Sequence, residues 1–136
     1  MIAAGTKEGA RALILFAHGA RDPGWAQPFE RLAVRVRTAA PGHEVRLAFL
    51  EIMSPDLAHV ASELVAGGAK SISVVPIFLG QGGHIRRDLP LLIEELRARH
   101  PDVKIECASP AGEEESVLEA MARYCVAQLN SPTTSN

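Results

Sequence analysis

The chain has 136 residues, of which 47% are hydrophobic and 22% charged, a composition typical of a globular domain that can form its own core. Its net charge of −2 gives no support for binding to nucleic acid or to an anionic membrane. Residues 1–9 lack the apolar core of a signal peptide, and no apolar run reaches transmembrane length. We therefore expect one cytoplasmic domain without a membrane or nucleic-acid partner.

Apolar runs and helical patterns alternate along the chain. Residues 1–10 show no periodicity and are expected to form a flexible arm, residues 11–130 a single domain, and residues 131–136 a disordered tail. The apolar runs predict four strands, at Arg11–Ala17, Glu44–Leu50, Ser71–Leu79 and Val103–Ala108. The helical patterns predict four helices: Trp25–Ala39, a second from Pro55 to the Gly67–Gly68 stop, Leu89–Arg99, and a last one from the glutamates at 113–115 to Leu129.

Residues that start helices or form apolar faces refine this pattern. Ser54 is the expected N-cap of the second helix, and Asp88 that of the third, with Pro90 in its first turn. The free cysteines Cys107 and Cys125 are expected to be small buried hydrophobic residues in a reducing compartment. The apolar face of the last helix consists of Leu118, Met121, Ala122, Cys125 and Leu129.

The order of elements is four βα units. Right-handed crossovers between parallel strands place helices on both faces of the sheet. The expected fold is therefore a small doubly wound, flavodoxin-like α/β domain whose four-stranded parallel sheet has the order 2-1-3-4. In such a fold, ligands bind at the carboxyl ends of the strands, where the direction of the connections reverses.

Two histidines and a glutamate follow predicted strands at that edge. His18 ends the first strand, Glu51 ends the second, and His84 follows the third. Imidazole is a good ligand for cobalt, nickel, zinc and iron, and a carboxylate can complete an open site from which the metal can leave. Each histidine on its own is also compatible with an ordinary surface or core position, and that is the expectation for His43, His59 and His100.

Glycines and arginines surround the second histidine. Gly82 and Gly83 allow the backbone to approach a flat ligand, whereas Gly80 to Ile85 fails the glycine pattern of nucleotide sites. Arg21, Arg86 and Arg87 are either solvated surface charges or, taken together, a binding set for a polycarboxylate. Trp25 either anchors the first helix or forms a wall of the ligand crevice.

Three motifs, in this order, resemble those of a known family. They are Phe16-Ala17-His18-Gly19-Ala20-Arg21-Asp22, Ala48-Phe49-Leu50-Glu51 with Pro55, and Val75-Pro76-Ile77-Phe78-Leu79-Gly80 with Gly83-His84 and Asp88-Leu89-Pro90. Over roughly residues 11–125, the chain resembles the small sirohydrochlorin chelatases, which are class II chelatases of cobalamin and sirohaem synthesis.

The resemblance implies ATP-independent insertion of a divalent metal into sirohydrochlorin, with cobalt as the first choice and nickel or iron as alternatives. It implies that His18 and His84 bind the metal, which is a substrate, and that Glu51 assists with metal or protons. The arginines, with Gly82 and Gly83, are the expected substrate-binding residues, and no nucleotide cofactor is expected. Larger members contain two such halves, so the resemblance favours a homodimer.

One departure from the family keeps another function open. The family usually has a serine where Ala20 stands. A carrier of metal or tetrapyrrole that kept the histidines without turnover is the alternative, and a domain with a merely structural sheet would bind no metal at all.

Overall fold

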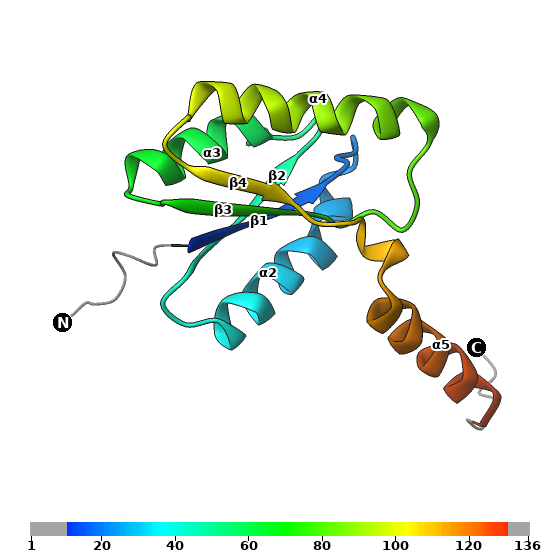
Figure 1. The fold of residues 1–136 in the computed structure, drawn as a ribbon. Coiled ribbons are helices and arrows are strands. Elements are labelled where there is room, and N and C mark those ends of the chain that lie inside the picture. Colours follow the sequence, from blue (N-terminus) through cyan, green and yellow to red (C-terminus); the bar gives the residue numbers. More distant parts are fainter. Residues whose placement is uncertain (1–10, 131–136) are drawn as a thin grey trace.

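The computed structural model describes residues 11–130, so the predicted N-terminal arm and C-terminal tail lie outside the described residues. A four-stranded parallel sheet forms the centre of the domain, and its order β2-β1-β3-β4 confirms the predicted topology (Figure 1). The strands are β1 (Arg11–Ala17), β2 (Glu44–Phe49), β3 (Ser71–Pro76) and β4 (Lys104–Cys107). No helix within the described range is long and apolar enough to cross a membrane.

The apolar side chains of the inner strand β1 pack on both faces of the sheet. Ile14 and Phe16 are fully buried on the side of α3 (Leu57–Ala66) and α4 (Gly83–Arg99). Leu15 is buried on the other side, against Ala33 of α2 (Gln27–Ala39), which follows a short 3-10 helix, η1 (Pro23–Ala26). An unbroken apolar run is therefore required, as expected for a parallel strand covered on both faces.

The predicted bounds are wrong around α4. Strand β3 ends at Pro76 rather than at Leu79, and α4 begins at Gly83 rather than at Leu89. Gly82 is extended and serves as N-cap, and the Arg86 amide already donates a helical bond to the Gly82 carbonyl at 3.0 Å. Asp88 and Pro90 therefore lie inside the helix rather than at its start. A proline in a helix is usually found in the first turn, so Pro90 led the sequence prediction to place the start of the helix too late.

The start of α3 also differs from the prediction. Its N-cap is Asp56, whose side chain accepts from the His59 amide at 2.8 Å, and not Ser54. Pro55 is not helical, because its carbonyl accepts a hydrogen bond from the Phe49 amide at 2.9 Å, which holds it beside β2. The other bounds are wrong by a few residues: α2 begins at Gln27, β2 ends at Phe49, and β4 spans Lys104–Cys107.

The last helix, α5 (Glu115–Asn130), follows a short 3-10 helix, η2 (Ala111–Glu113), and none of its residues is buried. It runs past the carboxyl ends of the strands and away from the sheet (Figure 1). The predicted apolar face is present, but this chain does not cover it. The expectation of a buried Cys125 is therefore wrong, whereas Cys107 is half-buried and its burial raises the pKa of the thiol.

Candidate functional site

The loops that follow β1 and β2 are tied together at the carboxyl edge. The Leu50 amide donates to the Ala17 carbonyl at 2.8 Å, and the Glu51 amide donates to the His18 carbonyl at 3.1 Å. Gly19 has a φ of +97°, and a Cβ there would collide with the Glu51 carbonyl oxygen. The glycine is therefore required both by its conformation and by the close approach of the two loops. The backbone of Glu51 is fixed beside His18, as the predicted strand order implies.

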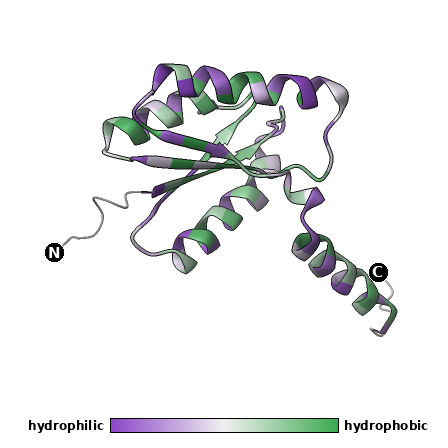
Figure 2. Cartoon of the chain, in the orientation of Figure 1, coloured by the Kyte–Doolittle hydropathy of each residue, from purple (hydrophilic) through white to green (hydrophobic). Residues whose placement is uncertain are grey.

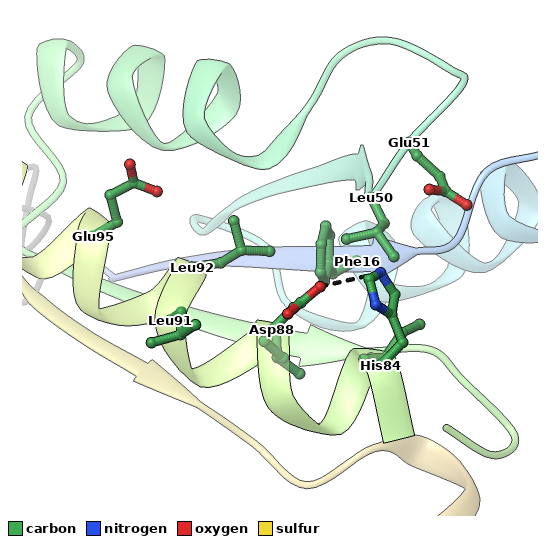
Figure 3. Close-up of a pocket in the computed structure, with 10 residues that line it drawn as sticks. Phe16, Leu50, Glu51, His84, Asp88, Leu91, Leu92 and Glu95 are labelled. Carbon is green, nitrogen blue, oxygen red and sulfur yellow. Dashed lines mark ion pairs between the residues drawn. The ribbon is translucent and has the colours of Figure 1, made fainter. Parts of the chain in front are cut away.

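A cavity of about 350 Å³ opens between α4 and this edge of the sheet. Figure 3 shows His84 and Asp88 on α4, with Glu51 on the loop after β2 and the apolar side chains of Phe16 and Leu50 between them. The complete lining is Phe16, Leu50, Glu51, His84, Ile85, Asp88, Leu89, Leu91, Leu92 and Glu95. The cavity therefore combines an apolar floor with one imidazole and three carboxylates, and it unites two of the predicted site residues, His84 and Glu51.

Asp88 is a site residue that the sequence prediction missed. The Nε2 atom of His84 lies 3.1 Å from the Asp88 carboxylate, one helical turn away, and both side chains remain accessible, at 75% and 43% exposure. The pair is drawn with a dashed line in Figure 3. The signal in the sequence was the spacing of four residues, which places both side chains on one face of a helix once the helix begins at Gly83.

His18 lies at the same edge but does not line this cavity. Its half-buried ring packs on Phe78, with ring centroids 4.5 Å apart and planes tilted by 44°. Trp25 packs on Phe29, with centroids 4.6 Å apart, and more distantly on Phe49, which agrees with its interpretation as an anchor of the first helix.

The expected arginines are not gathered in one place. Arg86 lines a neighbouring cavity of about 270 Å³ between α4 and β4, and its guanidinium donates to the Gln81 carbonyl at 3.5 Å. Arg21 and Arg87 are exposed, as are Gly82 and Gly83 at the amino end of α4. No group of three histidine, cysteine, aspartate or glutamate side chains within residues 11–130 is arranged to hold a metal ion.

Two of the remaining histidines have ordinary surface contacts, whereas the buried Nε2 atom of His100 has no hydrogen-bond partner among the described residues. His59 is exposed and lies 3.1 Å from Glu63, which also accepts from Arg46 at 2.6 Å. That hydrogen bond from Arg46 is the main reason why the pKa of Glu63 is lowered. His43 contacts the Arg11 carbonyl at 3.3 Å. His100 is half-buried at the end of α4.

Comparison with known proteins identifies the family. The model of the CbiX family matches residues 12–126. The chain belongs to the CbiX family. It is 33% identical over 91 residues to a sirohydrochlorin cobaltochelatase of Sulfurisphaera tokodaii, a match that covers 67% of this chain and 72% of the relative. A sirohydrochlorin cobaltochelatase of Saccharolobus solfataricus is 30% identical over 117 residues, which cover 82% of this chain and 90% of the relative.

Solved structures share the same fold. A cobalamin biosynthesis CbiX protein of Marinobacter aquaeolei superposes with a TM-score of 0.78 at 32% identity, covering 88% of this chain and 98% of that one. The sirohydrochlorin chelatase SirB of Bacillus subtilis subspecies spizizenii, solved with cobalt, gives a TM-score of 0.68 at 27% identity. That match covers 86% of this chain but 50% of SirB, so the CbiX-family chain corresponds to half of the SirB chain.

Proposed function

We propose that this CbiX-family chain is a metal chelatase that inserts a divalent metal ion into sirohydrochlorin without ATP, with cobalt as the first candidate and nickel and iron as alternatives. One observation carries the proposal. The cavity at the carboxyl edge places an accessible imidazole beside the Asp88 carboxylate above an apolar floor, with Glu51 and Glu95 in the same lining, in a chain whose relatives are sirohydrochlorin cobaltochelatases. Imidazole and carboxylate suit these metals, and the apolar floor suits a flat macrocycle.

His84 is the proposed first metal ligand. Asp88 occupies its Nε2 atom, which leaves Nδ1 for the metal and fixes the orientation of the ring. His18 and Glu51 lie at the same edge and are proposed to assist as the second imidazole and as a group that takes up metal or protons. Metal insertion releases two pyrrole protons, and neutral imidazoles and carboxylates are suitable acceptors for them.

The proposed partners of the substrate's carboxylates lie in the loop after β1 and in the first residues of α4. Arg21, Arg86 and Arg87 form no ion pair with any carboxylate of the described chain, so their charges are free for a ligand. Gly82 and Gly83 begin α4, where the first amides have no helical acceptor and attract anions. Among residues 11–130, no atom lies within 4 Å of the position that a Cβ of Gly82 would take, which leaves room for a flat ligand there.

A homodimer is part of the proposal. One copy has a single wall at the carboxyl edge, whereas the SirB chain is about twice as long as the part that this chain matches. Two copies related by a two-fold axis, with their cavities facing a shared cleft, would give the macrocycle two walls.

The test is a spectral assay under anaerobic conditions. Sirohydrochlorin is mixed with cobalt, nickel or ferrous iron, with the protein present at one hundredth of the substrate concentration. A chelatase converts the whole substrate pool faster than the uncatalysed reaction. The alternative is a carrier without turnover, suggested by Ala20 in place of the family's serine. A carrier would change the spectrum only in proportion to the amount of protein added.

Two sets of variants separate the metal role from the substrate role. His84→Ala should weaken Co²⁺ binding and turnover while sirohydrochlorin binding survives. Arg86→Ala with Arg87→Ala should do the reverse, at a cost of at least about tenfold in sirohydrochlorin affinity, because even one lost charge-assisted contact is worth about 1.5–3 kcal/mol. His59→Ala is the control and should change neither, because the exposed His59 side chain pairs with Glu63 and does not line the cavity. Wild-type turnover of His84→Ala with all three metals would contradict the proposal.

A further inference from the structure

Large hydrophobic side chains are exposed at the carboxyl edge, beside the cavity. Within residues 11–130, and apart from α2 and α5, three such side chains are exposed: Ile52 at 62%, Leu79 at 67% and Leu91 at 67%. Leu91 lines the cavity, whereas Ile52 and Leu79 follow β2 and β3, each three residues after the end of its strand. Figure 2 shows hydrophilic and hydrophobic residues alternating along α4, the usual pattern of a helix with one buried side. The exposed apolar residues of the two loops therefore lie where ligands bind in this kind of fold.

The loops that carry Ile52 and Leu79 flank the end of β1. Strand β1 lies between β2 and β3 in the sheet, and His18 follows it directly. Neighbouring strands lie about 4.8 Å apart, so the ends of β2 and β3 are about 10 Å apart at this edge. A flat macrocycle that lies over His18 would therefore meet an apolar side chain on each side of it.

The backbone at Ile52 is strained. Its φ is +70°, and the Met53 amide donates to the Glu51 carbonyl at 2.7 Å, so Ile52 is the centre of a γ-turn of the rare form with positive φ. A glycine adopts such a φ without strain, whereas a β-branched residue is the least suited to it. Strained residues of this kind occur preferentially at functional sites. The strain at an exposed isoleucine therefore points to a role for its side chain.

The contacts of its two neighbours hold Ile52 in this conformation. The Glu51 amide donates to the His18 carbonyl at 3.1 Å, so both backbone groups of Glu51 are bonded, and its side chain lines the cavity. On the other side of the turn, Met53 packs against the buried cluster that contains Phe49. Since one neighbour is fixed at the cavity and the other packs inward, the side chain of Ile52 is left exposed at the edge.

We propose that Ile52 and Leu79 bind the ring of sirohydrochlorin, one on each side of His18. This inference rests on the proposed function and deepens it, because the proposed metal ligands and arginines leave the apolar surface of the ring without a partner. Contact between an aliphatic side chain and the ring removes apolar surface of both from water, which favours binding. The two side chains would therefore select a ligand with a flat apolar ring over a polycarboxylate that lacks one.

Three substitutions at Ile52 separate the contact with the ring from the strain of the backbone. Ile52→Gly and Ile52→Asn suit a positive φ better than isoleucine but lack its apolar side chain, whereas Ile52→Leu keeps an apolar side chain. The Kd for sirohydrochlorin, measured without metal from the fluorescence of the tetrapyrrole, should rise about tenfold in the first two variants, since the ring would cover roughly half of the isoleucine side chain. Leu79→Asn should have a similar effect, and Ile52→Leu should bind nearly as well as the wild type.

Two further measurements on Ile52→Gly exclude a merely structural effect. Its Kd for Co²⁺ should be that of the wild type, and its midpoint of urea unfolding should not fall, because the glycine relieves strain and the lost side chain is mostly exposed. Val34→Asn is the matched control: Val34 is also β-branched and 56% exposed, but it lies on α2 and lines neither of the two cavities, so sirohydrochlorin should bind unchanged.

The outcomes that would overturn the inference are distinct from those that would overturn the proposed function. Wild-type affinity of Ile52→Gly for sirohydrochlorin would overturn the inference alone, and so would a loss of affinity together with Co²⁺ binding and stability. A loss of affinity that accompanies a change of oligomeric state in light scattering would show that a second copy covers these residues, and would also overturn it. A wild-type chain that does not bind sirohydrochlorin would overturn the proposed function as well.

Discussion

Replacing Asp88 by asparagine should weaken metal binding without altering the cavity. The substitution keeps the size of the side chain but removes the charge that lies 3.1 Å from Nε2 of His84. Carboxylates that hold a metal-binding histidine contribute about 10–100-fold to metal affinity. With His84 at 75% and Asp88 at 43% exposure, water screens the pair, so we expect the lower end of that range, about tenfold, or about 1.4 kcal/mol.

The assay is a titration of Co²⁺ against a chromophoric chelator, followed by insertion rates at saturating metal. Asp88→Asn should raise the Kd for Co²⁺ about tenfold, and excess metal should restore most of the insertion rate, because the substrate contacts remain. Glu95→Gln is the matched control: it removes the same charge from the same cavity and helix, but Glu95 pairs with Arg99 rather than with His84. Equal effects of the two variants would mean that the total charge of the cavity matters and that the pair does not. An unchanged Kd in Asp88→Asn would refute the reasoning.

Three further outcomes are expected. Gly19→Ala should lower the midpoint of urea unfolding and slow insertion, because the new Cβ would displace the Glu51 carbonyl; a variant with wild-type stability and rate would contradict this close packing. Glu63→Gln should lower the urea midpoint at about pH 7 and not at about pH 2, because the hydrogen bond from Arg46 lowers the pKa of Glu63, so its contribution is present above the ordinary glutamate range and is lost as the pH falls through the folded-state pKa. Insertion should slow in acid, because a protonated imidazole cannot bind the metal, and a rate that is flat down to about pH 5 would indicate that carboxylates alone bind it.

The strand order could be predicted because two separate features of the sequence indicate it. Apolar runs such as Arg11–Ala17 are distinctive for strands buried on both faces, and the alternation with helices leaves few topologies. The edge that carries His18 and Glu51 followed from that order alone, and backbone hydrogen bonds join these two residues in the structure. Residue positions that depend on the topology could therefore be predicted from the sequence.

The start of α4 could not be predicted in the same way. Glycines such as Gly82 and Gly83 are typical of loops, and Pro90 is typical of a first turn, so local preference pointed to a later beginning. Packing of Ile85 and Leu89 in the core, together with the rest of α4, outweighs the preferences of single residues there. The pairing of His84 with Asp88 was therefore not predicted either, because these two side chains meet only when both residues lie on a helix.

The position of His84 in the first turn of α4 has opposite consequences for the two substrates. The positive end of a helix disfavours a nearby cation by about 0.3–1 kcal/mol and favours an anion by a similar amount. Asp88, Glu51 and Glu95 offset that penalty for a metal ion, but no closed set of ligands within the described chain holds it. The metal should therefore bind loosely enough to leave. The carboxylates of the macrocycle would gain from the same helix end, so in the proposed site the helix favours the tetrapyrrole and disfavours the free metal ion.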